Sequence, residues 1–80
     1  MSRFEVQYFA LLREQAGRSV ETIESTARTA RELYADLARQ HGFSLGAERL
    51  KVAVNDEFAS WEQVLAEGDR IVFIPPVAGG

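Results

Sequence analysis

The sequence contains no cysteine, only one lysine (Lys51) and only one histidine (His41), and these shortages exclude several kinds of chemistry. Without cysteine the chain can form no disulfide, no thiolate nucleophile and no cysteine-based metal site. The net charge of −3 argues against generic nucleic-acid binding, which needs a basic surface. No apolar run approaches membrane-spanning length, and residues 1–5 lack the apolar core of a signal peptide, so we expect a cytoplasmic protein.

The composition is that of a small globular protein. With 46% hydrophobic and 26% charged residues, the chain is too apolar to be disordered. Its 80 residues suffice for one domain with a small core, and no stretch resembles a linker or a repeat. We therefore expect a single domain over 1–80, in which 75–80 form an extended C-terminal tail.

A half-buried strand is predicted near the start of the chain. Phe4, Val6 and Tyr8 alternate with polar residues, which is the period of a strand with one face on the core. Phe9 follows on the opposite face as an apolar exception. A short helix over 10–16, which ends at a left-handed glycine, is expected next. A second strand over 18–24, anchored by Val20 and Ile23, is expected to follow.

The clearest element is an amphipathic helix that begins after Thr29. Thr29 and Glu32 have the spacing of a capping box, in which Glu32 reaches back from the third helical position. Gly42 is expected to end the helix. The apolar face repeats at helical intervals and consists of Ala30, Leu33, Tyr34, Leu37, Ala38 and His41.

The second half of the chain is predicted to be mostly extended. A strand over 50–54, a turn at 55–57 and a short strand over 58–60 lead to an irregular segment, in which Val64 and Leu65 are expected to pack inward. After a tight turn at 67–69, the last strand follows over 70–74. One helix on one face of a mixed sheet of about five strands is an α+β arrangement, and this element order is that of the ubiquitin-like β-grasp fold. The first and last strands would then lie side by side at the sheet centre.

The end of the chain has the features of a reactive arm. Pro75 and Pro76 stop the last strand, because proline cannot donate a ladder hydrogen bond, and they favour an extended exit from the body. Gly79 and Gly80 have no Cβ, so they can enter a narrow channel, and the carbonyl carbon of Gly80 is unshielded. Chemistry at the Gly80 carboxylate is the functional hypothesis, although two terminal glycines alone are a weak signal.

The internal side chains give no sign of a self-contained active site. His41 is expected to have a packing or capping role at the end of the helix. The acidic pairs at 56–57 and 67/69 lie in turns without a histidine or cysteine partner, so we interpret them as turn formers and expect no metal site. Trp61 is expected to pack rather than to bind a ligand.

An exposed apolar patch is predicted at the root of the tail. If Ile71 and Phe73 face the core, then Val72 and Ile74 face outward on the last strand. The predicted patch consists of Phe9, Phe58, Val72 and Ile74. Such a patch is typical of a protein–protein contact, unless a loop covers it or the register of one strand differs from the prediction.

Three parts of the sequence resemble the small subunit of molybdopterin synthase, the MoaD family. The similar stretches are Tyr8-Phe9-Ala10 with Leu12-Arg13-Glu14, Ala53-Val54-Asn55 with the Gly-Asp turn of 65–71, and the ending Phe73-Ile74-Pro75-Pro76-Val77-Ala78-Gly79-Gly80. The resemblance extends over nearly the whole chain. Its most specific part is the Gly-Asp turn together with Pro-Pro-Val-Ala-Gly-Gly.

The resemblance implies a sulfur carrier that works through Gly80. In this family an adenylating, E1-like enzyme uses ATP to convert the terminal carboxylate to an acyl-adenylate, and a separate sulfur donor then turns it into a thiocarboxylate. The tail enters the large subunit and delivers sulfur to the pterin precursor of the molybdenum cofactor. By resemblance the large subunit would contact Phe9, Phe58, Ile74, Pro75, Pro76, Val77, Ala78 and Gly79. The chain itself would bind no cofactor, and the catalytic side chains would belong to its partners.

Three alternatives remain open at this point. Sulfur carriers for thiamine or cysteine synthesis share the fold and the terminal glycines. A ubiquitin-like protein modifier would join Gly80 to a lysine of its target through the same acyl-adenylate. The third alternative is a β-grasp interaction module whose tail is inert.

Overall fold

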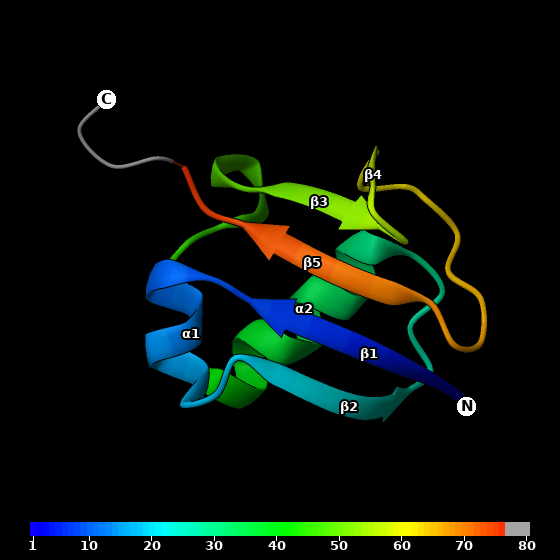
Figure 1. Ribbon diagram of the computed structural model, residues 1–80, viewed down its shortest axis with the longest axis horizontal. Helices are drawn as coiled ribbons and strands as arrows, with labels where there is room; N and C mark the ends of the chain where they lie inside the picture. Colours follow the sequence, from blue (N-terminus) through cyan, green and yellow to red (C-terminus); the bar gives the residue numbers. More distant parts are fainter. Residues whose placement is uncertain (77–80) are drawn as a thin grey trace.

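One long helix lies across one face of a mixed sheet in the computed structural model, which describes residues 1–76 (Figure 1). The predicted site residues Val77, Ala78, Gly79 and Gly80 lie outside the described residues. The elements in chain order are β1 (Ser2–Tyr8), α1 (Ala10–Ala16), β2 (Val20–Ser25), α2 (Ala30–His41), the 3₁₀ turn η1 (Ala47–Arg49), β3 (Lys51–Val54), β4 (Glu57–Ala59) and β5 (Arg70–Ile74).

Within these residues the sheet has five strands in the order β2-β1-β5-β3-β4. The first and last strands are neighbours, as predicted, and they run parallel, while β2, β3 and β4 pair antiparallel with their neighbours. This is the predicted β-grasp arrangement. The strand that leads to Pro75, β5, lies at the sheet centre and is bonded to a neighbouring strand on each side.

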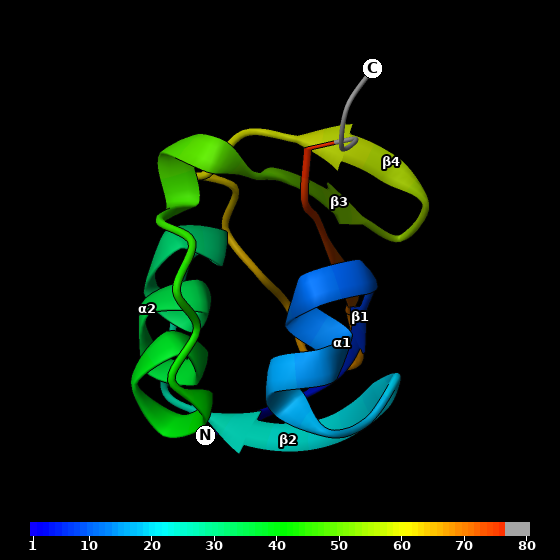
Figure 2. The same cartoon turned by 90° about the vertical axis from the view of Figure 1, so that its left-hand side faces the viewer.

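The core fills the layer between the sheet and α2 (Figure 2). Phe4, Val6 and Tyr8 of β1 are fully buried, as their alternation predicted, and so are Ile71 and Phe73 of β5. The predicted apolar face of α2 supplies the other side of the core, with Ala30, Leu33, Tyr34 and Leu37 buried. The two periodicities, two for the strands and 3.6 for the helix, therefore specify which side chains meet.

The caps of α2 explain why the helix begins and ends where it does. The Thr29 hydroxyl accepts a hydrogen bond from the Glu32 N–H at 3.2 Å, as predicted for an N-cap. The Glu32 carboxylate, however, accepts from the N–H of Arg28 at 2.7 Å, one residue before the predicted partner Thr29. Gly42 ends the helix in the left-handed conformation, with φ of 73°.

The prediction for β2 was wrong in its bounds and in one anchor residue. The strand covers Val20–Ser25 rather than 18–24, and Val20 is 49% exposed. Antiparallel pairing places Ile23 opposite Phe4 and Glu21 opposite Val6, so Glu21 and Ile23 face inward. The carboxylate of Glu21, rather than the predicted anchor Val20, therefore faces inward beside Ile23.

The prediction that Val64 packs inward was also wrong, whereas Leu65 is buried as expected. Val64 is 69% exposed because its segment binds α2 through backbone groups. The carbonyls of Trp61 and Gln63 accept hydrogen bonds from the first N–H groups of α2, at 2.9 and 3.1 Å, and the N–H of Leu65 donates to the Arg28 carbonyl at 2.9 Å. The segment thus satisfies helix donors that would otherwise lack partners.

Candidate functional site

The base of the tail is fixed by packing on both sides of β5. Phe73 is fully buried and stacks on Trp61, with 5.9 Å between ring centroids, and its ring edge meets Tyr34 at 5.1 Å. On the sheet, Phe73 lies opposite Tyr8 of β1 and Val52 of β3. Ile74 and Pro75 are half-buried, and Pro76 is exposed. The exit point of the tail is therefore held rigidly, whatever its last residues bind.

The predicted apolar patch lies on the sheet face opposite α2, which is turned to the viewer in Figure 1. Phe58 on β4 is 74% exposed, and Phe9, the N-cap of α1, is 41% exposed. Because Tyr8 pairs with Phe73 in parallel strands, the next residues, Phe9 and Ile74, follow at the same level. We name Phe9, Phe58 and Ile74 the outer-face patch.

Val72 was wrongly predicted to be exposed with the outer-face patch. Its side chain does face outward, but only 9% of it is accessible, because it lies between Gln7 of β1 and Ala53 of β3 on the central strand. Ala53 in turn lies opposite Phe58. Val72 and Ala53 therefore form a nearly covered apolar bridge between Phe58 and the tail side of the patch.

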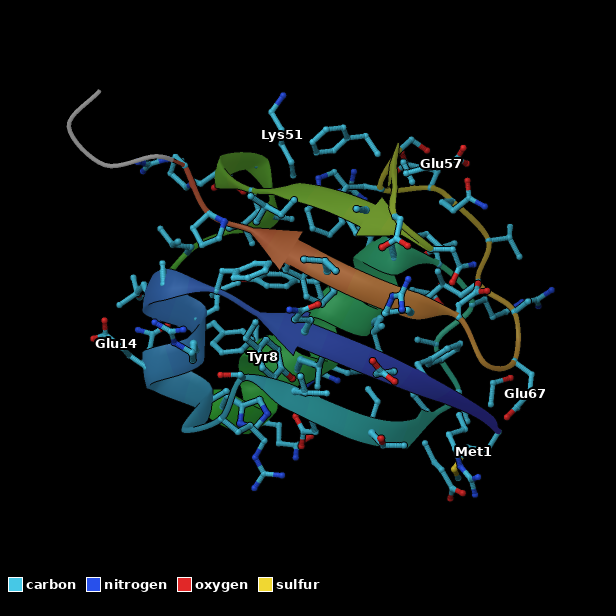
Figure 3. The ribbon with its side chains drawn as sticks, viewed as in Figure 1. Met1, Tyr8, Glu14, Lys51, Glu57 and Glu67 are labelled. Atoms are coloured by element: carbon cyan, nitrogen blue, oxygen red, sulfur yellow. The ribbon has the colours of Figure 1, made fainter. Side chains whose placement is uncertain are left out.

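Sequence reasoning missed the residues of β3 that accompany the tail. Lys51 lies directly opposite Ile74, and it projects from the end of β3 nearest the tail (Figure 3). A pocket of about 260 Å³ at the root of the tail is lined by Glu48, Arg49, Leu50, Lys51, Ile74, Pro75 and Pro76. No local pattern in the sequence indicates this, because the start of β3 comes beside the end of β5 only through the antiparallel pairing of the two strands.

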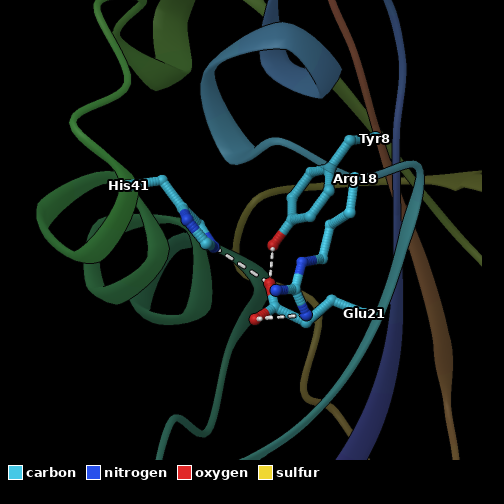
Figure 4. A network of polar contacts seen from close by, with 4 residues as sticks. All are labelled: Tyr8, Arg18, Glu21 and His41. Atoms are coloured by element: carbon cyan, nitrogen blue, oxygen red, sulfur yellow. Dashed lines mark hydrogen bonds and ion pairs between the residues drawn. The ribbon is translucent and has the colours of Figure 1, made fainter.

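A second polar arrangement joins three elements beneath the sheet (Figure 4). Glu21 of β2 accepts a hydrogen bond from the Tyr8 hydroxyl at 2.7 Å and lies 2.9 Å from Nε2 of His41, at the end of α2. The Arg18 guanidinium lies 4.0 Å from the other carboxylate oxygen. His41 also meets the Tyr8 ring edge-on, at 5.8 Å between centroids. His41 thus has the packing role expected for it, with Glu21 as a partner that the sequence had not suggested.

The network perturbs the ionisation of two of its members. Burial alone would raise the pKa of Glu21, but the hydrogen bonds from Tyr8 and His41, together with the charges of His41 and Arg18, lower the pKa below its usual range. Burial, and then the bond to Glu21, raises the pKa of the Tyr8 hydroxyl. Glu21 is therefore an ionised acceptor at neutral pH and Tyr8 a protonated donor.

Replacing Glu21 with Gln is expected to reduce stability at neutral pH and to flatten its dependence on acid. The pKa of Glu21 in the folded protein lies below the unfolded value of about 4.5. The ionised carboxylate therefore stabilises the protein above that pH, and this stabilisation is lost as the pH falls through the folded pKa. The loss at pH 7 should be about 1–3 kcal/mol, typical of removing a charged hydrogen-bond acceptor that is largely shielded from solvent, because only 10% of the Glu21 side chain is accessible. Urea unfolding from about pH 3 to about pH 7 would measure this loss of stability, because the range includes the ordinary pKa of a carboxylate.

Glu24→Gln is the matched control for this prediction. Glu24 lies on the same strand, but it is exposed and its partner Arg3 is an exposed residue at 3.5 Å, so this change should have little effect. Equal effects of the two substitutions would contradict the role assigned to Glu21.

The acidic turn residues hold the ends of the sheet together. Asp69 accepts hydrogen bonds from the Ala66 N–H at 2.7 Å and from the Asn55 side chain at 2.9 Å, and Asp56 pairs with Arg70. These contacts confirm Asp56 and Asp69 as turn residues. Within residues 1–76, no three His, Cys, Asp or Glu side chains are grouped as metal ligands would be.

The amino-acid sequence that forms this β-grasp fold matches a known family model. The model is that of the ThiS family, and it matches residues 6–80. The chain belongs to the ThiS family. The match extends to Gly80, so the terminal residues that the structure does not describe are part of the family pattern.

Two curated proteins that are similar in sequence to this ThiS-family chain are named molybdopterin synthase sulfur carrier subunits. The protein of Escherichia coli K12 is 32% identical over 79 residues, which cover 95% of this chain and 98% of the relative. The protein of Haemophilus influenzae is 35% identical over 78 residues, which cover 94% and 96%. The resemblance to the MoaD family of sulfur carriers is thereby confirmed.

A solved structure shows a similar fold in a complex. It is the complex of subunits 1 and 2 of the molybdopterin-converting factor from Helicobacter pylori, 28% identical, with a TM-score of 0.67 over 98% of this chain and 99% of that chain. In this ThiS-family chain, none of the helices in the described residues is both long and apolar enough to cross a membrane.

Proposed function

We propose that this chain is the sulfur-carrier small subunit of a molybdopterin synthase. The observation that supports this most directly is the nearly full-length similarity to two proteins named as such subunits, together with a family match that includes Gly80. The central position of β5 supports it as well, because a carrier must present its reactive end at a fixed distance from the surface that its partner recognises.

The chemistry takes place at the C-terminal carboxylate. On an E1-like activating enzyme, a Gly80 carboxylate oxygen attacks the α-phosphorus of ATP and pyrophosphate leaves, which gives an acyl-adenylate. Sulfur from a separate donor then attacks the acyl carbon and AMP leaves, which gives the thiocarboxylate. ATP is a substrate of the activating enzyme, so the carrier needs no cofactor of its own. The absence of cysteine fits this mechanism, because the sulfur is carried on the chain terminus.

The partner that receives the sulfur is the large subunit of the synthase. The outer-face patch of Phe9, Phe58 and Ile74 supplies the contact surface beside the exit of the tail. Residues Pro75, Pro76, Val77, Ala78 and Gly79 lead Gly80 into the active site of the large subunit, where sulfur passes to the pterin precursor. The catalytic side chains of that step belong to the large subunit.

The test is the intact mass of the protein purified gently from cells that make the molybdenum cofactor. The expected result is a mass gain equal to the exchange of one oxygen for sulfur, localised to Gly80, and its loss after incubation with the large subunit and the pterin precursor. If the protein never supports exchange of pyrophosphate into ATP by an activating enzyme, its carboxylate is not adenylated and the proposal is refuted. Recovery of Gly80 joined to lysines of other proteins would favour the modifier instead.

Replacing Phe58 or Ile74 with lysine is expected to weaken binding to the large subunit by about 30-fold or more. This is the effect of losing an interface residue worth about 2 kcal/mol. The thermal stability should change little for Phe58→Lys, because this side chain is mostly exposed. Titration calorimetry with the large subunit would measure the affinity.

Val64→Lys is the matched control for the patch variants. Val64 is similarly exposed and apolar, and it lines the same pocket as Phe58, but it lies in the segment that binds the start of α2 and is not a member of the outer-face patch. Unchanged binding by this variant is expected. Equal weakening by all three substitutions would mean that the patch is not the contact surface.

A further inference from the structure

One outward-facing residue from each of the five strands lies in a row across the sheet face opposite α2. The strand pairing that aligns them gives the row Val20, Gln7, Val72, Ala53 and Phe58. We name these residues the cross-strand row. It runs from one edge of the sheet to the other, and all of its members except Gln7 are apolar.

The rows farther from the tail on the same face are polar. In the next row, Glu5 lies between Thr22 and Arg70, and in the row after that Arg3 pairs with Glu24 at 3.5 Å. The cross-strand row is therefore the boundary of the apolar surface that begins at the root of the tail. A partner that binds through apolar contact would reach this row and stop before the charged residues.

Gln7 is the one polar member of the cross-strand row. It is half-buried between Val20 of β2 and Val72 of β5. In residues 1–76, the side-chain hydrogen bonds of β1 involve only Arg3 and Tyr8, so the Gln7 carboxamide has none. No buried side-chain nitrogen or oxygen in the same residues lacks a partner, so both polar atoms of the carboxamide are accessible to solvent. In the free protein, water therefore satisfies this group.

A partner that covers the outer-face patch would also cover Gln7. Phe9 is extended and follows Gln7 by two residues, about 7 Å farther along the same face. Val72 lies beside Gln7 on the adjacent strand, and Ala53 continues the row to Phe58. An interface of ordinary size covers about 800 Å² on each partner, much more than these spacings require. Contact with both Phe9 and Phe58 would therefore displace water from Gln7.

Covering Gln7 requires a polar group on the partner. A carboxamide that loses its water and gains no hydrogen bond opposes binding, because desolvation is then uncompensated. The group has donors on its nitrogen and an acceptor on its oxygen. The N–H and C=O of a backbone segment, or the side chain of asparagine or glutamine, can satisfy both.

We propose that Gln7 is a specificity-determining residue of the carrier, whose carboxamide hydrogen-bonds a backbone or side-chain amide of the large subunit. Val20, which is 49% exposed, extends the apolar contact beside it to β2. This role of Gln7 rests on the proposed function, because its continuity with the outer-face patch identifies the large subunit as the partner. A hydrogen bond has a preferred direction, which apolar contact lacks, so it fixes the orientation of the large subunit relative to the tail.

The first test compares Gln7→Met with the native chain by titration calorimetry with the large subunit. Methionine keeps the length and the apolar part of the side chain but has no amide. Gln7→Met should weaken binding by about tenfold, because it leaves the polar group of the partner without a hydrogen bond. Glu5→Met is the matched control. Glu5 is exposed on the same face of β1, in the polar half, so its replacement should leave the affinity unchanged.

A second pair of variants tests how far the contact extends. Val20 and Thr22 are both exposed on the same face of β2, but only Val20 belongs to the cross-strand row. Val20→Lys should weaken binding by about fivefold, whereas Thr22→Lys should bind normally. Thermal unfolding of each variant would show that the sheet is intact.

The side-chain amide signal of Gln7 in the ¹⁵N-labelled protein reports the hydrogen bond directly. Its absence from the spectrum of Gln7→Met identifies it. On addition of the large subunit, this signal should shift, and its hydrogens should exchange with water more slowly. An unchanged signal in the bound protein would contradict the role of Gln7 even if the affinity of Gln7→Met is reduced.

The outcomes separate the role of Gln7 from the proposed function. If Gln7→Met binds as tightly as the native chain or more tightly while Phe58→Lys binds weakly, Gln7 is not a specificity determinant and the proposed function stands. Loss of pyrophosphate exchange with normal large-subunit binding would assign Gln7 to the activating enzyme instead. Concentration-dependent dimers that Val20→Lys abolishes would assign the row to a second copy. If the native chain does not bind the large subunit, the proposed function and the role of Gln7 are both wrong.

Discussion

A chain that ends at Ala78 is expected to have no sulfur-transfer activity and the same thermal stability as the full-length protein. The activity should be lost completely, because the proposed electrophile is the carbonyl carbon of Gly80 and no internal side chain can replace it. The stability should be unchanged because the sheet and the core lie within residues 2–74. Pyrophosphate exchange and pterin sulfuration with the purified partners would measure activity, and thermal unfolding would measure stability.

Phe58→Lys provides the complementary control for this truncation. The truncated chain should lose the contacts of Gly79 and Gly80 but retain most of its affinity for the large subunit through the outer-face patch, although it cannot carry sulfur. Phe58→Lys should show the reverse, with normal adenylation and poor binding to the large subunit. If pterin sulfuration continues with the truncated chain, Gly80 has no part in the mechanism. The interaction module with an inert tail would then be the better explanation.

The parts of the fold that the sequence predicts well are those in which every residue favours the same structure. In β1, strict alternation of Phe4, Val6 and Tyr8 fixes the register and leaves Phe9 outside. In α2, a capping threonine, a helical apolar face and a terminal glycine agree on one element. The side-by-side position of β1 and β5 follows from the element order, and it brings the tail to the sheet centre.

The errors occur where long-range contacts decide the conformation. Glu21 faces inward because Tyr8 and His41, distant in sequence, supply its hydrogen bonds, and no local pattern on β2 indicates this. Val64 faces outward because the backbone of its segment is bonded to the start of α2. Val72 is covered although it faces outward, since accessibility depends on neighbouring strands as well as on the strand's own alternation.

The candidate site could be predicted from the sequence only in part. Because proline and glycine have distinct backbone properties, Pro75, Pro76, Gly79 and Gly80 together predict a reactive tail, and its chemistry stays a prediction. The residues beside the tail, Lys51 among them, become neighbours only through pairing of β3 with β5.

Phe73→Ala is expected to have the largest effect on stability of any substitution considered. Truncation of a buried phenylalanine costs about 3–5 kcal/mol through lost transfer energy and the cavity that remains. Small domains have only about 5–15 kcal/mol in total, so this variant should be close to the limit of folding at moderate temperature. Each kcal/mol should lower Tm by about 4–8 °C in a domain of this size, and urea unfolding would give the free energy directly.

Neighbouring substitutions distinguish this packing role from a general sensitivity of β5. Phe73→Leu keeps most of the apolar volume and should cost much less than Phe73→Ala. Val72→Ala removes a smaller side chain from the outer face of the same strand and should also cost less. A loss in Phe73→Ala no greater than that in Val72→Ala would show that Phe73 does not anchor the strand.

The same variant tests whether the tail depends on the rigidity of its base. Phe73 immediately precedes Ile74 and holds β5 against Trp61 and Tyr34. At a temperature where Phe73→Ala is still folded, loss of this anchor should weaken binding to the large subunit. A more mobile β5 would lose conformational entropy when the partner orders it on association. Adenylation of Gly80 should depend less on the anchor if the activating enzyme binds mainly the terminal residues. Equal losses in both reactions would mean that both partners recognise the rigid strand end rather than the free terminus.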